Sequence, residues 1–254
     1  MNNIKQTILF ALLLAFIVSC TPTKRIQKNM NLKSSSMAYI MDSKVSENKN
    51  GIAINIDTIR FNPHIMSDTT KVKREKGYFL PLILVYIWNS QNKCTLGKGT
   101  FEEDIPDFLA ASLSREADRS GIFDISNTAP SEYSLDISVD SISTEGQYIS
   151  SGFFYFALYI YGYSYSDIAG PANSTLRISY KLRKNDEVIH SNSFTAQKVT
   201  EPISRKYTDT GILQQDYAVS MVEAVSSNFK NIIEEIVNDL NIYFTEHNEG
   251  ADDN

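Results

Sequence analysis

The sequence predicts an α+β fold, a two-layer sandwich in which two helices cover one face of a four-stranded mixed sheet. Three segments alternate apolar and polar residues with the period of two that is typical of half-buried strands. Two other segments repeat apolar residues at spacings of three and four, as amphipathic helices do. With one weaker strand added near residue 190, the order is strand, helix, strand, strand, strand, helix, and both helices are expected on the apolar face.

The first predicted strand opens the folded domain. Ile52, Ile54 and Ile56 alternate with small or polar residues, and the apolar phase then slips before Ile59. Because the side chains of a strand alternate strictly between two faces, this slip predicts a bulge or a strand end near Asp57.

A helix is predicted next, from residue 105 to residue 120. Asp104 suits the N-cap position, and Pro106 lies in the first turn, where its missing N–H costs little. Gly121 suits the C-terminal end, where the backbone often adopts a positive φ. The predicted buried face consists of Ile105, Phe108, Leu109, Ser112, Leu113 and Ala117.

Three strands are predicted to follow, at residues 133–140, 176–183 and 188–199, the last two joined by a tight turn at residues 184–187. If the first two of these pair antiparallel, Asp136 and Asp140 face Arg177 and Lys181 across the solvent side of the sheet. Opposite charges at such positions contribute about 0.2–1 kcal/mol per pair, so the charge pattern favours this pairing.

The last predicted element is a long helix that closes the domain. Its apolar residues recur at spacings of three and four, and charged and amide residues occupy the other side. The stripe consists of Ala218, Val222, Val225, Phe229, Ile232, Ile236, Leu240 and Tyr243. We therefore expect a single domain at residues 51–245 and an acidic tail at residues 246–254.

Two hydrophobic insertions interrupt this plan, at about residues 66–100 and 147–172. Residues 78–88 form an uncharged apolar run that contains the only tryptophan, and residues 153–165 contain eight aromatic residues in thirteen. A right-handed crossover makes the first two strands parallel, so both insertions leave the sheet at one edge. There we expect them to pair as strands, because pairing satisfies their backbone groups.

These insertions predict a composite interaction surface. Its candidate residues are Leu82, Leu84, Tyr86, Trp88, Tyr155, Tyr159, Tyr161 and Tyr163. The alternative interpretation is that both insertions are additional strands packed into the core. On the first interpretation the surface binds a partner or a membrane, since exposed apolar patches mark interaction sites.

The first 19 residues have the features of a secretory signal peptide. Lys5 provides positive charge, and the apolar run from Ile8 to Val18 is too short to span a bilayer as a helix. The following Ile17-Val18-Ser19-Cys20 resembles the lipobox of bacterial lipoproteins. That resemblance implies cleavage before Cys20, a diacylglycerol group on its thiol and a further acyl chain such as palmitate on its amine. An ordinary signal peptide with an incidental cysteine is the alternative.

A tether is predicted between the lipid and the domain. Residues 20–50 are rich in serine, asparagine and lysine, and residues 21–50 hold six basic against two acidic residues, a composition typical of a flexible linker. Thr21 follows the cysteine where lipoproteins retained in the inner membrane carry Asp, and no acidic run follows. This resembles the outer-membrane case and implies an anchor on the periplasmic face, with the cell surface as the alternative.

No motif for catalysis, metal binding or a cofactor is recognisable in the sequence. The three histidines lie far apart, and Cys94 is the only cysteine besides Cys20, so no disulfide is expected within the mature chain. A net charge of −6 disfavours general nucleic-acid binding, which requires a basic surface. We therefore expect no enzymatic activity, no metal, no cofactor and no nucleic-acid partner.

The layout resembles a group of bacterial envelope lipoproteins that includes outer-membrane assembly lipoproteins and auxiliary lipoproteins of ABC-type transporters. The resemblance rests on the lipobox, on Leu113-Ser114-Arg115 through Arg119-Ser120-Gly121-Ile122-Phe123, and on the following strand, and covers roughly residues 51–61, 102–143 and 174–242. It carries over no functional residue.

The resemblance implies a lipid-anchored accessory or assembly protein that binds another envelope protein or membrane complex and is not an enzyme. One alternative is a surface lipoprotein that binds glycan through a tyrosine-rich face, since sugar rings stack on aromatic planes. A second alternative is an enzyme without a recognisable motif. The oligomeric state and the identity of the partner are not encoded in any motif.

Overall fold

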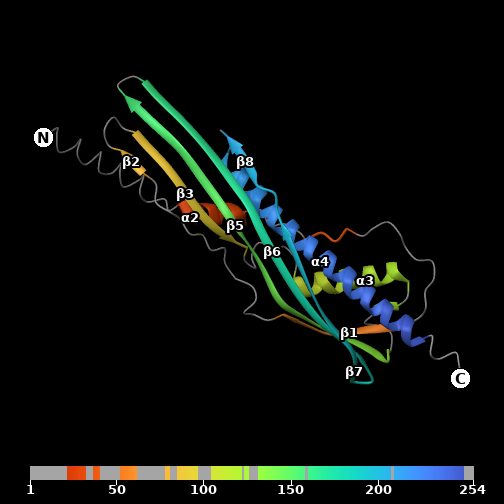
Figure 1. Cartoon of the computed structure of the whole chain (residues 1–254). Coiled ribbons are helices and arrows are strands. Elements are labelled where there is room, and N and C mark those ends of the chain that lie inside the picture. The colour runs from red at the N-terminus through yellow and green to blue at the C-terminus, as the bar shows by residue number, and fades with distance from the viewer. Residues whose placement is uncertain are drawn as a thin grey trace.

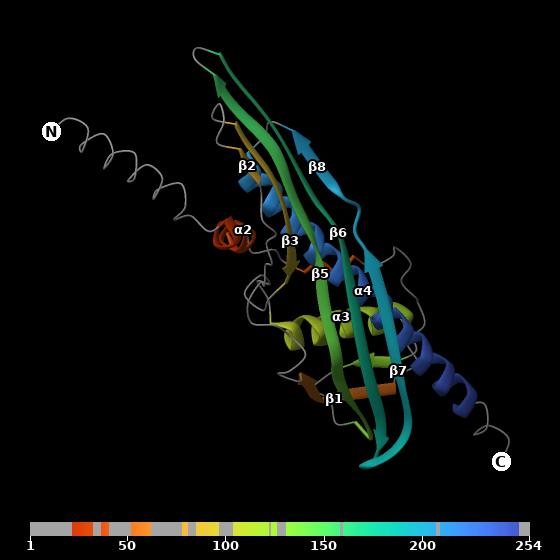
Figure 2. The same ribbon diagram turned by 60° about the vertical axis from the view of Figure 1, so that its left-hand side comes forward.

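A long β-hairpin forms the spine of the molecule. In the computed structural model, which describes residues 22–32, 37–40, 52–61, 78–80, 85–96, 104–121, 123–125, 131–157, 160–206 and 209–248, its arms are β5 (Tyr133–Ala157) and β6 (Ile160–Lys184). Each arm has 25 residues, and the two pair antiparallel along their whole length. Figures 1 and 2 show this hairpin running from one end of the molecule to the other.

The other strands lie along the two flanks of the hairpin. On one flank β1 (Ile52–Phe61) pairs parallel with the first part of β5, and β3 (Val85–Thr95) pairs antiparallel with its distal part. On the other flank, β7 (Glu187–Val199) and β8 (Ile203–Lys206) both pair with β6. The edge strands β4 (Phe123–Ile125) and β2 (Tyr78–Leu80) complete a sheet of eight strands.

Three described helices cover one face of this sheet: α2 (Pro22–Asn31), α3 (Ile105–Ser120) and α4 (Thr210–Asn248). The longest, α4, packs against β6 and β7 and also contacts α2 and α3 (Figure 2). Leu135, Ile137 and Val139 of β5 are buried beneath these helices, and so is Phe229 of α4. The core is therefore the layer between the helices and one face of the sheet.

The structure confirms the α+β class, the predicted order of the main elements and several local details. β1 and β5 are parallel, and their register shifts between Ile56 and Thr58, where the bulge is predicted. Gly121 ends α3 with φ of 72°. The turn between β6 and β7 has positive φ at Asn185 and Asp186, as type I′ hairpin turns require.

The charged pairs on the open face of the sheet also form. Asp136 pairs with Arg183 at 2.9 Å and Asp140 with Arg177 at 3.9 Å, whereas Lys181 lies directly across from Asp136 without being its ion-pair partner. Asp104 precedes α3 with an extended backbone, but its side chain makes no capping hydrogen bond.

The predicted sheet of four strands with two helices is too small. The two insertions pair with each other as strands, as predicted, but they extend the same sheet, since their chain forms β2, β3 and the distal halves of β5 and β6. The last helix also continues beyond the predicted domain end, through residue 248. Apolar insertions next to an open edge extend the sheet, since pairing is the way their backbone groups are satisfied.

The predicted flexible tether is wrong for residues 22–31, which form α2. Ile26 and Met30 are buried against the body, as is Met37 further along. Asn29 donates a hydrogen bond from Nδ2 to Oε1 of Gln214 on α4, at 2.7 Å. The signal peptide, Cys20 and residues 249–254 lie outside the described residues.

Candidate functional site

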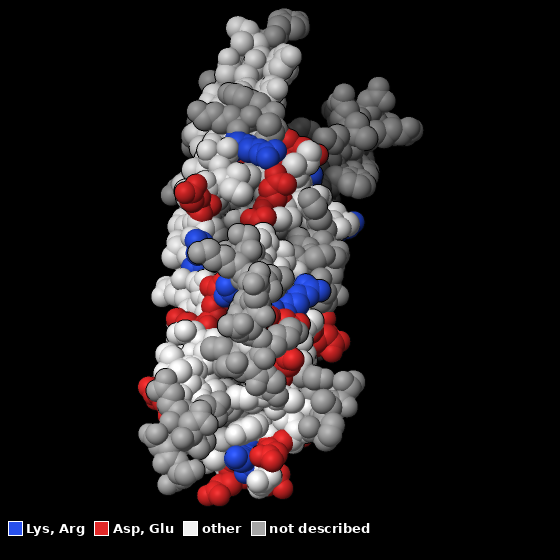
Figure 3. All heavy atoms as spheres, turned by 90° about the vertical axis from the view of Figure 1, so that its right-hand side faces the viewer, with Lys and Arg blue, Asp and Glu red and all other residues white. Residues whose placement is uncertain are grey.

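The distal half of the hairpin contains no charged residue. None occurs between Glu145 and Asp167, or in β3 before Lys93. On the surface shown in Figure 3, this end of the molecule displays no described Lys, Arg, Asp or Glu side chain, in contrast to the charged surface below it. The site is therefore built from aromatic, aliphatic and small polar groups.

The strand register brings aromatic residues from three strands onto one face. Tyr86, Phe154 and Tyr163 lie in one row across β3, β5 and β6, and Phe156 pairs with Tyr161 in a neighbouring row. This is the face that the helices cover further down the sheet. We call the following group the aromatic face: Tyr86, Trp88, Phe154, Phe156, Tyr161 and Tyr163.

Burial declines along each strand toward the end of the hairpin. On β6, Asp167 and Ala169 are buried, Tyr165 is half-buried, and Tyr161 is 68% exposed. On β5, Tyr148 is buried and Phe154 is 41% exposed. The helices cause this gradient, because the hairpin extends past the start of α4 (Figure 1), and no described helix reaches its end.

Two glycines leave room for aromatic rings from the neighbouring strand. A Cβ atom on Gly152 would stand 2.2 Å from Cζ2 of Trp88, so the indole occupies the space that a side chain would fill. On the opposite face, a Cβ atom on Gly162 would stand 2.3 Å from Cε1 of Tyr155. The rings of Tyr86 and Trp88 stack with centroids 5.6 Å apart and planes inclined by 22°.

The predicted interaction residues divide into three groups. The structure brings Tyr86, Trp88, Tyr161 and Tyr163 to one face, as the sequence predicts. It places Tyr155 on the opposite face, which corrects the prediction of a single tyrosine face. The prediction treated residues 153–165 as one strand. In the structure these residues belong to two antiparallel strands, β5 and β6, so odd-numbered residues of β5 and odd-numbered residues of β6 lie on opposite faces of the sheet. Leu82, Leu84, Tyr159 and Cys20 lie outside the described residues.

A pocket of about 300 Å3 lies at the base of the aromatic face. β3, β5 and β6 form its floor, and the first turns of α2 and α4 form its walls. The lining residues are Arg25, Ile26, Tyr86, Trp88, Ser90, Tyr148, Ser150, Asp167, Thr210 and Gln214. The sequence predictions did not include Asp167, Tyr148 or Gln214, although Asp167 is the first charged residue after the long uncharged stretch.

Asp167 is the unusual group in this pocket. Its side chain is only 2% exposed, and neither carboxylate oxygen makes a hydrogen bond of normal length and angle to a described residue. Burial raises the pKa of the Tyr148 hydroxyl above its ordinary value, and the charge of the nearby Asp167 and weak hydrogen bonding with it raise the pKa further, against an opposing interaction with Gln214. Tyr148 therefore stays protonated beside the carboxylate.

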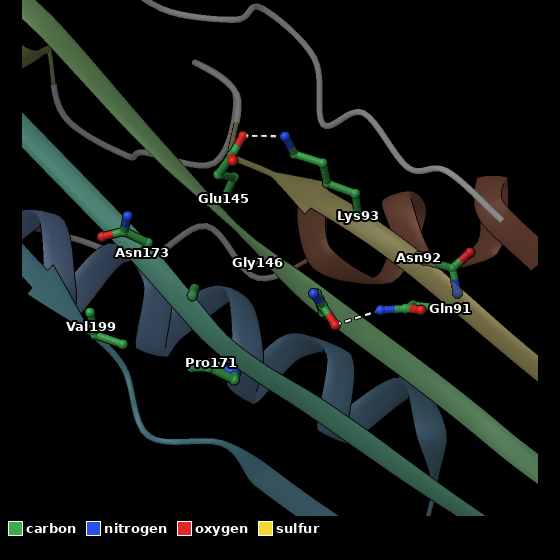
Figure 4. Close-up of a pocket in the computed structure, with 10 residues that line it drawn as sticks. Gln91, Asn92, Lys93, Glu145, Gly146, Pro171, Asn173 and Val199 are labelled. Carbon is green, nitrogen blue, oxygen red and sulfur yellow. Dashed lines mark hydrogen bonds and ion pairs between the residues drawn. The ribbon is translucent and has the colours of Figure 1, made fainter. Parts of the chain in front are cut away.

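A second hollow, of about 480 Å3, lies over β3, β5 and β6, next to the register shift between Gly146 and Tyr148 (Figure 4). Its two charged side chains pair with each other, and so do two of its glutamines. Lys93 forms an ion pair with Glu145 at 2.5 Å, and Gln91 donates a hydrogen bond to Gln147 at 2.6 Å. Because its charges are neutralised internally, this hollow presents no unpaired charge to a ligand.

Two further polar clusters lie between the helices and other elements. Glu116 is fully buried, pairs with Arg119 and accepts a hydrogen bond from the Tyr39 hydroxyl at 2.7 Å. The hydrogen bond to Glu116 is the main reason that the pKa of Arg119 is raised. This cluster attaches the segment around Tyr39 to α3.

The second cluster centres on Asp239 of α4. Asp239 accepts a hydrogen bond from the Tyr180 hydroxyl and contacts His190 Nε2 at 2.9 Å. Partial burial raises the pKa of Asp239, but hydrogen bonds from Tyr180, His190 and Asn192 outweigh it, so the pKa is lowered overall. The cluster connects α4 to β6 and β7.

Cys94 is buried in β3, where desolvation raises the pKa of its thiol to about 12. A thiol with so high a pKa is a poor nucleophile at neutral pH. Within the described part of the chain, no three His, Cys, Asp or Glu side chains gather to hold a metal ion. No described helix is both long enough and apolar enough to cross a membrane.

No protein-family model and no curated protein sequence matches this chain. Among solved structures, it is similar to a Xanthomonas campestris protein of the DUF330 family, at 15% identity over 85% of this chain and 99% of that chain, with a TM-score of 0.46. It is similar to a neuraminyllactose-binding hemagglutinin homologue from Helicobacter pylori, at 13% identity over 85% and 98%, with a TM-score of 0.40. A minor lipoprotein from Acinetobacter baumannii matches at 10% identity over 56% and 88%, with a TM-score of 0.31. Likenesses at this level assign the chain to no family.

Proposed function

We propose that this chain is a lipid-anchored accessory protein of the bacterial cell envelope that binds another envelope protein or membrane complex through the aromatic face. The observation that carries the proposal is the uncovered end of the hairpin, where five members of that face are 37–68% exposed. A contiguous exposed apolar patch is typical of an interaction site. Tyrosine and tryptophan are also the residues that contribute most at protein interfaces.

The position of α2 supports a site close to the membrane. Only Thr21 separates Cys20 from Pro22, so a lipid on Cys20 would be joined to a residue within about 7 Å of the start of α2. The first turns of α2 line the pocket beside Tyr86 and Trp88. On this proposal, the anchor and the aromatic face lie at the same end of the molecule, on the periplasmic side of the outer membrane.

The lipid anchor is tested by labelling. In cells fed a clickable fatty acid, the wild-type chain is expected to carry label and Cys20→Ala to carry none and to remain an uncleaved precursor. Protease treatment of intact cells tests the orientation, since only a surface-exposed protein is digested. Label on the variant would refute the proposed lipid attachment at Cys20. Digestion of the wild-type protein would show that it lies on the cell surface and not on the periplasmic face.

The partner is tested by photo-crosslinking in intact cells. A benzoylphenylalanine residue in place of Tyr161 is expected to form an adduct with a second envelope protein. The same residue in place of Lys181, exposed on the other half of β6, is the matched control and should form none. Equal adducts at both positions would contradict the proposal, and adducts with lipid alone would assign the aromatic face to the membrane.

A glycan is the second candidate ligand. The exposed Tyr86 and the adjacent Trp88 offer aromatic rings of the kind on which a sugar ring stacks. Binding of isolated envelope polysaccharide that is lost in Trp88→Ala, but retained in Tyr155→Ala on the opposite face, would favour this candidate over a protein partner.

The proposed role is non-enzymatic. The histidine and acidic groups with close partners serve as links between elements, as Asp239 does between α4 and β7 and Glu116 does between α3 and the segment around Tyr39. Neither cluster lies in the pocket beside the aromatic face.

A further inference from the structure

The buried carboxylate of Asp167 calls for a positively charged partner. An ionised carboxylate without a hydrogen bond or a counter-ion is costly to bury, so such groups are normally paired. Asp167 is 2% exposed, and neither of its oxygens makes a hydrogen bond of normal geometry or an ion pair with a residue that the structure describes, although the Tyr148 hydroxyl lies nearby. It lies in the lining of a pocket rather than in the packed interior of the sheet.

Two arginines of the chain lie near this carboxylate. Arg205 is directly opposite Asp167 in the β6–β8 pairing, but its guanidinium pairs with Asp216 of α4 at 2.7 Å. Arg25 lines the same pocket from α2, and its side chain is exposed. In the described arrangement neither side chain neutralises Asp167, which leaves the position open to a cation from outside.

The walls of the pocket suit an organic cation. Trp88 and Tyr86 present aromatic rings, whose faces attract ammonium and guanidinium groups. Trp88 is held in place by a hydrogen bond from Nε1 to Ser150 Oγ at 3.3 Å. The Tyr148 hydroxyl lies between Asp167 and Gln214 and adds a polar group beside the carboxylate without forming a normal hydrogen bond to it.

We propose that this pocket binds an alkylammonium or alkylguanidinium group, with the charge on Asp167 and the apolar chain against Trp88 and Tyr86. A volume of about 300 Å3 accommodates a group of the size of a lysine or arginine side chain. One carboxylate between aromatic walls suits such a cation better than a divalent metal ion, which takes several oxygen ligands. The pocket shares Tyr86 and Trp88 with the aromatic face, but its ligand is defined by charge and its test requires no partner, so the two proposals can fail independently.

Calorimetric titration of the full-length protein in non-ionic detergent tests this proposal. The probes are n-butylammonium and butylguanidinium, with n-butanol as the neutral control. Two further probes distinguish the natural sources of the cation: Nα-acetyl-lysine amide represents a protein side chain, and glycerophosphoethanolamine represents a lipid headgroup. Quenching of Trp88 fluorescence gives a second readout, because Trp88 is the only tryptophan.

The cationic probes are expected to bind and n-butanol is not. Asp167→Asn keeps the shape of the side chain and removes its charge, so it should weaken binding by roughly 10- to 100-fold, as loss of a charged hydrogen bond does. Its melting temperature should equal or exceed that of the wild type without probe, because an unpaired buried charge is removed. That result also shows that the variant is folded.

Three results would overturn the proposal. The first is no binding of either cation, and the second is equal binding to Asp167→Asn. The third is a lowered melting temperature in both Asp167→Asn and Arg25→Gln, which would assign the carboxylate to an internal ion pair.

Discussion

The two halves of the β5–β6 hairpin belong to the same pair of strands and have opposite chemistry. In the proximal half, Leu135 and Ile137 are buried under helices, while Asp136 and its neighbours form ion pairs on the open face. In the distal half, both faces are apolar: Phe154 is 41% exposed on one face and Phe153 is 42% exposed on the other. The hydrogen-bonded ladder continues through both halves without a change of partner.

This difference in chemistry suggests that the proximal half stabilises the domain and the distal half serves recognition. The proximal half buries its apolar side chains and exposes its charges, which is how a sheet contributes to a stable domain. The distal half exposes large aromatic groups that contribute little to stability in the isolated chain. Substitutions of similar chemistry should therefore have very different effects in the two halves.

The largest effect is expected from a charge in the proximal core. Phe229 of α4 is fully buried, and its ring meets that of Phe108 edge to face at 5.6 Å. Phe229→Asp should lower the free energy of unfolding by about 4 kcal/mol or more, since it combines lost packing with an unpaired buried charge. Urea denaturation measures this change, and Ile242→Asp, at a position 50% exposed on the same helix, is the matched control. Equal stability of the two variants would show that α4 is not packed as described.

A smaller effect is expected where the distal half has local packing of its own. Gly152→Val places side-chain atoms where the Trp88 indole lies, and the Cβ atom would also stand 2.5 Å from the Ser164 carbonyl oxygen. Overpacking of this kind costs about 1–3 kcal/mol. The displaced indole should become more exposed, so tryptophan emission should shift to longer wavelength. The control is Asn89→Val, at an exposed position next to Trp88, which should leave the emission spectrum unchanged. An unshifted spectrum for Gly152→Val would show that the indole does not lie over this glycine.

The proximal half should also lose stability in acid. Hydrogen bonds hold the pKa of Asp239 below its ordinary value of 3.8, so its carboxylate stabilises the fold above that value. The contribution is lost as the pH falls through the lower pKa of the folded state. Asp239→Asn should lower stability at pH 7 by about 1–2 kcal/mol and flatten the loss of stability between pH 4 and pH 2. A slope as steep as that of the wild type would assign the acid sensitivity to other carboxylates.

The sequence predicts the proximal half well because its pattern is generated by burial on one face alone. The period of two in β5 and the spacings of three and four in α4 both record contact with a single core. The slip near Asp57 likewise predicts the bulge, and Gly121 the end of α3. Local sequence patterns are sufficient to predict an element when one of its faces is buried and the other is exposed to solvent.

The distal half and α2 are predicted poorly for different physical reasons. A strand that is apolar on both faces gives no parity signal, so the sequence does not show that the chain reverses between Ala157 and Ile160, and Tyr155 is assigned to the wrong face. In α2, Ile26 and Met30 are the main apolar residues in a polar segment. The composition of this segment is therefore that of a flexible linker, and the sequence does not indicate that the helix packs on the body. The Asp167 pocket requires the register of three strands and the positions of two helices, none of which is encoded locally.

The smallest effect on stability is expected at the end of the hairpin, and there it tests the division of roles most directly. Tyr161 is 68% exposed on the aromatic face. Tyr161→Asp should change the free energy of unfolding by no more than about 0.5 kcal/mol, as exposed substitutions usually do. It should nevertheless abolish the crosslink that a benzoylphenylalanine residue in place of Phe156, the cross-strand neighbour of Tyr161, is expected to form with the partner. The reason is that a charge placed in the centre of an apolar contact must be desolvated without a partner. Val188→Asp, 45% exposed at the opposite end of the sheet, should preserve both stability and the crosslink. If Tyr161→Asp lowers the melting temperature by many degrees, the aromatic face is part of the stabilising core, and the two halves of the hairpin do not differ in role.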